Sequence, residues 1–157
     1  MALSSSILDE LQSMPAALLD AAAKISPPDY SKPAENGDFS LLEQACHLRD
    51  LEKEAYLVRI SRILQEECPH LEDFDGAKIA AERNYRAQNL PAAITGFERA
   101  RSEALRILRS LSDRQLERTG RFAGTRTITL RDLVEMMLEH DRTHRREIAA
   151  LLEEMHP

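Results

Sequence analysis

The sequence TLRDLVEMMLEHDRTHRREIAALLEEM, residues 129–155, has the pattern of one long amphipathic helix. Thr129 is a typical N-cap residue, and Asp132 at the third helical position places a carboxylate near the positive end of the helix dipole. Residues of one face then recur every three or four positions. They are Leu133, Met137, His140, His144, Ile148, Leu151 and Met155. This seam predicts a helix that packs against others along most of its length.

A second helix is predicted from Ser40 to about Glu67. Ser40 and Glu43 form a capping box, in which each side chain accepts a hydrogen bond from the backbone amide of the other residue. Pro69 ends the helix, because proline cannot continue the hydrogen-bond ladder. The apolar residues with roughly helical spacing are Leu41, Ala45, Leu48, Ala55, Val58 and Ile63.

Two further segments complete a set of four helices. Residues Ser6 to about Lys24 are interrupted by Pro15, which predicts a short helical turn followed by a helix. Another helix is predicted from Pro91, because proline suits the first turn. Its seam consists of Ile94, Phe97, Arg101, Ala104, Leu108 and Leu111.

The segments between these helices carry loop signals. Residues 26–39 are rich in Pro, Gly and polar residues, and residues 68–90 predict an irregular connection with a candidate short helix from Lys78 to Arg86. Residues 119–127, which contain Gly120 and Gly124, are expected to form a loop, and no sustained strand pattern is present. We therefore predict one all-α domain over residues 1–157, folded as a four-helix bundle.

Composition excludes several classes of function. Of the 157 residues, 43% are hydrophobic, which is too many for a disordered chain. The net charge of -6 disfavours nucleic acid as a partner, and no apolar run approaches the roughly 20 residues of a membrane span. The start MALSSSILDELQ lacks the features of a signal peptide, and Cys46 and Cys68 form no disulfide or thiolate metal motif. These observations favour a cytoplasmic protein.

Three histidines are candidates for a metal site. His140 and His144 lie one turn apart on the predicted inward face, so both imidazoles can reach one ion. His47, two turns into the second helix, can point toward the same axis. Three imidazoles leave a divalent ion an open coordination position, which is typical of catalytic sites. The alternative is that these histidines are solvated or hydrogen-bonded within the protein.

The sequence resembles the DinB/YfiT-like superfamily. Residues 140–148, HDRTHRREI, are similar to the signature of the last bundle helix in that family, and residues 38–52, DFSLLEQACHLRDLE, are similar to its loop and second helix. Similarity continues through Arg101 to Leu111 and Gly124 to Leu133. The resemblance implies a four-helix bundle with a metal held by His47, His140 and His144. The chain departs from the pattern at Phe39, where Trp is common, and at Arg145 and Arg146.

Other residues are candidates for supporting roles. Glu43 and Glu147 lie about one turn from a candidate ligand and could accept a ring N–H. Asp141, to which the family resemblance draws attention, follows a candidate ligand and could fix its position or act as a base. Solvated charges are the alternative. Arg145 and Arg126 are candidates for binding a substrate carboxylate, as are Arg121 and Arg146. The string from Glu67 to His70 is interrupted by Pro69, which argues against a di-iron site.

The resemblance implies a metal-dependent thiol S-transferase or hydrolase. Such an enzyme would act on small electrophiles with a low-molecular-weight thiol, using a divalent ion, with Zn or Ni favoured by the three imidazoles. The partners expected are therefore a small-molecule thiol and an electrophile, together with a second copy of the chain in a homodimer. The alternative is a metal-binding or stress-induced protein without turnover.

Overall fold

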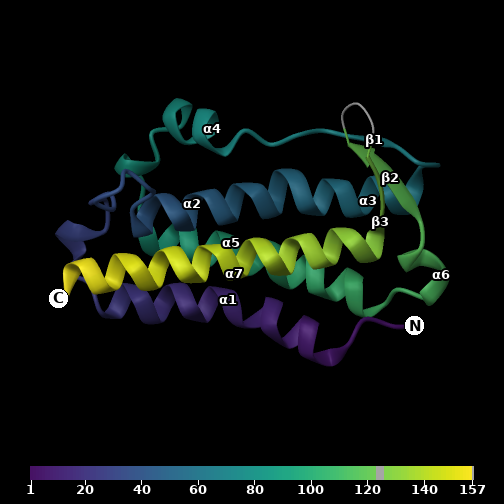
Figure 1. Ribbon diagram of the computed structural model, residues 1–157, viewed down its shortest axis with the longest axis horizontal. Coiled ribbons are helices and arrows are strands. Elements are labelled where there is room, and N and C mark those ends of the chain that lie inside the picture. Colours follow the sequence, from purple (N-terminus) through teal and green to yellow (C-terminus); the bar gives the residue numbers. More distant parts are fainter. Residues whose placement is uncertain (123–125, 157) are drawn as a thin grey trace.

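Four long helical segments pack side by side in the computed structural model, which describes residues 1–122 and 126–156 (Figure 1). The predicted four-helix bundle is confirmed. In chain order the elements are α1 (Ser5–Ala23), the 3-10 helix η1 (Pro27–Asp29), α2 (Leu41–Leu51), the π-helical turn η2 (Glu52–Tyr56), α3 (Leu57–Gln65), β1 (His70–Leu71), α4 (Gly76–Glu82), the 3-10 helix η3 (Tyr85–Ala87), α5 (Leu90–Arg109), α6 (Asp113–Leu116), β2 (Thr119–Phe122), β3 (Thr127–Thr129) and α7 (Leu130–Met155).

The bundle has two pairs of helical segments that run in opposite directions. The continuous segment α2–η2–α3 runs in the same direction as α5, whereas α1 and α7 run the other way (Figure 1). Since α3 ends at the opposite end of the bundle from the start of α5, residues 66–89 must return along its length. The irregular connection predicted for residues 68–90 is this return, and it carries α4 across the outside of α2.

The first helix differs from the prediction, because α1 is continuous through Pro15. Proline lacks the amide that would bond to the carbonyl four residues earlier, which is that of Leu11. This carbonyl instead accepts a hydrogen bond from the guanidinium of Arg101 on α5, at 2.7 Å. A side chain from another helix therefore replaces the missing bond.

The second helical segment contains a π-helical turn that the sequence did not reveal. A π turn adds one residue to the helix and so rotates everything that follows. Val58 was predicted on the inward face and is 46% exposed, whereas Arg59 and Ile60 are buried. The capping box of Ser40 and Glu43, predicted at the start of this segment, is confirmed.

A small β-sheet covers one end of the bundle, contrary to the expectation of no strands. Its order is β1–β2–β3, with β1 parallel and β3 antiparallel to β2. The predicted loop 119–127 is part of this hairpin, and Gly124 lies outside the described residues. At Gly120 an added Cβ would lie 2.8 Å from a methyl of Leu71, so the strand packs closely because this residue has no side chain.

The short helix expected from Lys78 to Arg86 is displaced. It begins earlier, at Gly76, because Asp75 caps it by accepting the amide of Lys78 at 3.1 Å. It ends at Glu82, two residues before Asn84, whose φ of 47° is incompatible with a continuing helix.

A polar layer divides the core into two apolar halves. On α7, Met137 belongs to one cluster and Ile148 to the other, and His140 and His144 lie between them. The buried polar residues at this level are His47, Glu52, Arg101, Asp141 and His144. The candidate site therefore lies near the middle of the bundle.

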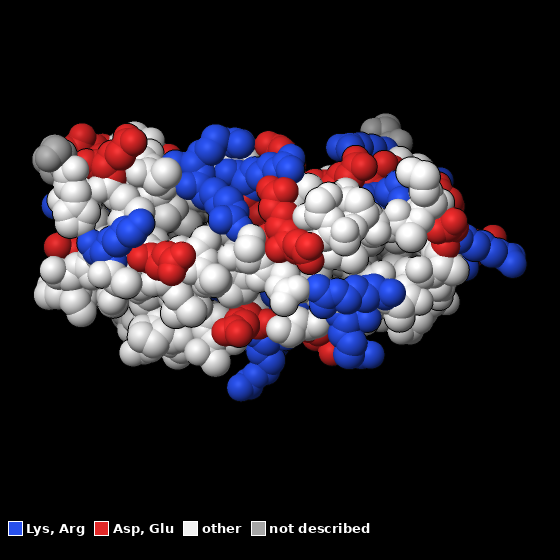
Figure 2. All heavy atoms as spheres, turned by 90° about the horizontal axis from the view of Figure 1, so that it is seen from below, with Lys and Arg blue, Asp and Glu red and all other residues white. Residues whose placement is uncertain are grey.

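The surface carries charges of both signs. On the face shown in Figure 2, positive and negative side chains lie close to one another. Arg142 of α7 pairs with Glu10 of α1, with nitrogen and oxygen 2.7 Å apart. Among the described residues, no helix combines the length and apolar character needed to cross a membrane.

Candidate metal centre

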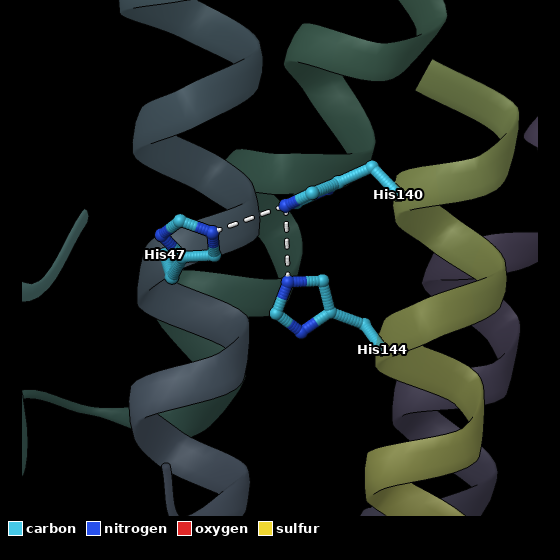
Figure 3. A group of neighbouring side chains, drawn as sticks. All are labelled: His47, His140 and His144. Carbon is cyan, nitrogen blue, oxygen red and sulfur yellow. Dashed lines mark hydrogen bonds between the residues drawn. The ribbon is translucent and has the colours of Figure 1, made fainter. Parts of the chain in front are cut away.

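His47 of α2 and both His140 and His144 of α7 point toward one another across the bundle (Figure 3). One ring nitrogen of each residue lies within 4.8 Å of the others. The Nε2 atom of His140 is 3.3 Å from Nε2 of His47 and 3.1 Å from Nε2 of His144. The structure thus brings together all three histidines that the sequence suggested as ligands.

The three imidazoles are neutral at physiological pH. Burial lowers the pKa of His47 to about 4, and the neighbouring His140 lowers it further. Burial likewise lowers the pKa values of His140 and His144 to about 3, with contributions from His144 and Arg101 in the first case and from His47 in the second. Neutral imidazoles are the form that binds metal ions.

Two side chains fix the orientation of His144. Its Nδ1 donates to Oε1 of Gln44, while the amide nitrogen of Gln44 donates to Glu147 at 3.0 Å. A carboxylate oxygen of Glu147 also lies 3.2 Å from this Nδ1. Because Nδ1 carries the proton, the lone pair of Nε2 points toward the other two histidines. This is how a metal-ligating histidine is usually held.

The arrangement of the three Nε2 atoms suits a cation better than hydrogen bonding alone. With the His144 lone pair facing inward, the single proton that His140 can place on Nε2 satisfies only one of its two close contacts. A tetrahedral ion with nitrogens at about 2.0–2.1 Å would separate its ligands by about 3.3–3.4 Å. The two short Nε2 distances are close to this value, so the donor set fits a divalent ion.

The ring of His47 is confined by its neighbours. It packs against Phe39 and Phe74, with ring centroids 5.7 and 6.0 Å away. On a further side it meets the backbone of Gly76, where an added Cβ would lie 2.7 Å from Cε1 of the imidazole. The start of α4 therefore needs glycine to leave room for this ring.

A buried ion-pair network lies next to the histidines. Arg101 is 1% exposed and bonds to Glu52 at 2.8 and 3.0 Å and to Asp141 at 2.6 and 3.1 Å. Burial raises the pKa of both carboxyls, whereas the guanidinium lowers it. Asp141 is thus tied to α5 and, among the described residues, makes no hydrogen bond to a histidine. The sequence placed Arg101 in an apolar seam and did not identify this network.

A cavity of about 460 Å³ opens beside the histidines. His47 and His140 form part of its wall, whereas His144 does not line it. Aromatic and aliphatic side chains form most of the remaining wall, and two arginines, Arg59 and Arg126, also border it. A small molecule in this cavity would contact two of the three imidazoles.

The other candidates from the sequence are distributed unevenly around this cavity. Arg126 lines it. Arg145 instead donates to Ser13 of α1 at 2.6 Å, and Arg146 pairs with Glu139, so neither borders the cavity. Glu43 caps α2 and pairs with Arg86, away from the imidazoles. Of the suggested supporting carboxylates, only Glu147 contacts a histidine.

Two supporting residues were missed by the sequence analysis. Gln44 is an amide on a predicted helix, a position that is usually solvated, and its only signal was its place three residues before His47. Arg59 was not singled out, because the π turn that buries it could not be anticipated. Both follow from tertiary structure and not from local pattern.

The fold and the three converging imidazoles define a class: four-helix bundles with a histidine site between their second and fourth helical segments. A family model of the DinB superfamily matches residues 10–148, and the chain belongs to this superfamily. The predicted resemblance is therefore confirmed. No match was found among curated protein sequences.

Solved structures agree with this assignment. The chain is similar to YfiT from Bacillus subtilis, a probable metal-dependent hydrolase with an unusual four-helix bundle topology, with a TM-score of 0.88 and 20% identity over 98% of this chain and 90% of that one. It is also similar to YjoA, a DinB-like protein from Bacillus subtilis, with a TM-score of 0.57 and 20% identity over 96% and 92% of the two chains. At this level of identity the likeness concerns the fold.

Proposed function

We propose that this protein is a divalent-metal-dependent enzyme that directs a small nucleophile, water or a low-molecular-weight thiol, against a small electrophile. The observation that carries the proposal is the convergence of three neutral imidazoles, two of which line a cavity. An ion held by three protein ligands keeps an open position and lowers the pKa of a water or thiol that binds there.

The chain's own residues hold and shield this site. Gln44 and Glu147 keep the Nε2 lone pair of His144 directed inward. Burial keeps all three rings neutral, so they would not repel a cation. The apolar walls of the cavity limit the water around a bound electrophile and strengthen electrostatic interactions there.

Two nucleophiles are compatible with this geometry. The likeness to YfiT, a probable metal-dependent hydrolase, favours water. The resemblance to a superfamily with thiol-using members favours a thiol, which would make the protein a thiol S-transferase. Imidazole ligands suit Zn and Ni, so these are the ions proposed.

The test compares metal-free protein with protein reconstituted with Zn or Ni. Hydrolysis of p-nitrophenyl acetate without thiol reports water as nucleophile, and conjugation of 1-chloro-2,4-dinitrobenzene reports a thiol, with glutathione, bacillithiol and mycothiol tried in turn. Turnover should require metal, disappear in His144→Ala and persist in His70→Ala, which alters an exposed histidine on β1.

The same experiment distinguishes an enzyme from a metal-binding protein without turnover. Stoichiometric metal binding without metal-dependent turnover of any of these substrates would contradict the enzymatic proposal and favour a metal-binding or stress-induced protein. Turnover that is equal with and without metal, or equal in His144→Ala, would contradict a role for the histidine site.

A further inference from the structure

Arg59 is a buried cation that, among the described residues, has no carboxylate in direct contact; the exposed Asp73 acts on its pKa only from further away. Arg59 is only 7% exposed, yet no carboxylate of the described residues lies within 4.0 Å of its guanidinium. One nitrogen, Nη2, donates to the carbonyl of Glu72 at 2.7 Å, and Nε has no hydrogen-bond partner among the described residues. An unpaired buried charge is unfavourable, so its presence calls for an explanation.

Arg101 differs from Arg59 in its hydrogen-bond partners. Arg101 is also buried, and it bonds to two carboxylates and a backbone carbonyl. Arg101 therefore has the partners expected of an arginine whose role is structural. Arg59 has hydrogen-bonding capacity left over, which a ligand could use.

The guanidinium of Arg59 is held in a fixed position at the wall of the cavity. Its Cζ atom lies 4.8 Å from the ring centroid of Phe122 and 5.6 Å from that of Tyr56. Such stacking orients the planar group without neutralising its charge. Arg59 lines the same cavity as His47 and His140.

The remaining wall of the cavity favours an anion with an apolar body. Arg126 adds a second positive charge, and the exposed Asp73 adds one negative charge. Phe74, Phe122 and Met136 supply apolar surface. A carboxylate suits the guanidinium in particular, because the two planar groups can form paired hydrogen bonds.

The π turn explains why an arginine occupies this position. In a regular helix Val58, eleven residues after His47, would lie on the same face as that histidine. The additional residue in η2 rotates α3 so that Arg59 is buried and Val58 is exposed. Single π turns of this kind often occur at functional sites.

We propose that Arg59 is the carboxylate-binding residue of this cavity and that the natural substrate is a small carboxylate with an apolar, ring-sized body. The carboxylate would pair with Arg59 while the apolar part lies against Phe74 and Phe122. The reacting group would then lie beside His47 and His140, a placement that rests on the proposed function. Binding of the carboxylate itself does not require a metal ion.

The experiment compares benzoate with benzamide, a neutral molecule of the same shape, by ligand-observed NMR titration of metal-free protein. Without metal, benzoate cannot bind through an ion. Benzoate is expected to bind about tenfold more tightly than benzamide or better, as charge-assisted hydrogen bonds allow. Arg59→Met should abolish this preference, and Arg59→Lys should retain part of it.

The matched control is Arg106→Met, which removes an exposed arginine of α5 that pairs with Glu103 and lies outside the cavity wall. It should keep the full preference for benzoate. Arg59→Met should also melt at the same temperature as the parent or higher, because it removes an unpaired buried charge. Should the methionine variant be insoluble, Arg59→Gln provides the same comparison.

Several results would overturn the proposal. They are equal binding of benzoate and benzamide by the parent, an undiminished preference in folded Arg59→Met or Arg59→Gln, and a loss of the preference in Arg106→Met. Failure of the proposed function is recognised separately: a protein that prefers benzoate through Arg59 yet shows no metal-dependent turnover supports the carboxylate site and contradicts the enzyme.

Discussion

At the scale of single residues, the histidine site depends on small neighbours as much as on the imidazoles. Gly76 shows this most directly. A Cβ at this position would lie 2.7 Å from Cε1 and 2.9 Å from Nδ1 of His47. Real Cβ contacts are longer, so the ring would have to move.

Gly76→Ala is therefore expected to weaken metal binding while the bundle remains folded. Displacement of a ligand by its surroundings typically reduces metal affinity by about 10- to 100-fold. Competition with a chromophoric chelator measures the change, and Ala77→Ser on the same short helix is the control. An unchanged affinity in Gly76→Ala would mean that the backbone of α4 does not confine His47.

Proton binding should link the histidines to stability in the metal-free protein. Their pKa values of about 3 to 4 in the folded state lie below the value of about 6.5 for an exposed histidine. Between these values the unfolded chain binds more protons, so stability rises with pH up to about 6.5 and is lost as pH falls.

Urea unfolding of metal-free protein between pH 4 and pH 7 measures this dependence. Replacing His144 with Asn should reduce the slope of unfolding free energy against pH by about 1.4 kcal/mol per pH unit below pH 6. A parallel slope in parent and variant would show that His144 is already accessible to protons in the folded state.

The sequence predicts the histidine ligands better than the residues that support them. His140 and His144 interrupt an apolar seam, and this interruption is visible in the linear pattern. Gln44 and Arg59 carry no comparable signal. Their roles depend on which face of the second helical segment turns inward, and that was set by contacts distant in sequence.

At the scale of elements, the helices are joined through a few buried polar contacts. Arg101 of α5 bonds to Glu52 in η2, to Asp141 of α7 and to the carbonyl of Leu11 in α1. It therefore connects all four helical segments. It also satisfies the carbonyl that Pro15 leaves free.

Arg101→Met is expected to destabilise the fold strongly. Removal of one partner from a buried ionic network leaves the carboxylates of Glu52 and Asp141 without compensation, which typically costs about 3–5 kcal/mol. Chemical denaturation gives the change, and Arg106→Met, on the exposed side of the same helix, should leave the transition unchanged. A loss below about 1 kcal/mol would contradict the account of Arg101 as the link between the segments.

Several elements could not be anticipated from local sequence. The strands contain between two and four residues, too few for alternation to appear. The π turn begins and ends within a segment that reads as one helix, and it moved Val58 to the surface. The continuity of α1 through Pro15 depends on Arg101, which is distant in sequence. Capping boxes, by contrast, are local, and the predicted starts of α2 and α7 are confirmed.

At the scale of the whole molecule, the polar layer lies between two apolar halves of the core. The histidines are not needed to complete the apolar core, and their mutual contacts leave hydrogen-bonding capacity unmet. The long return of residues 66–89 places Phe74 and Gly76 over this layer. The topology of the bundle thus encloses the site and forms one side of its cavity.

The central claim is that the three imidazoles hold one divalent ion, and elemental analysis of tag-free protein, purified without metal-affinity chromatography, tests it most directly. We expect about one equivalent of metal per chain in the parent and in His70→Ala, and none in His144→Ala. The absence of metal from all three proteins, even after incubation with Zn or Ni followed by dialysis, would contradict the claim, as would an equal metal content in the parent and His144→Ala.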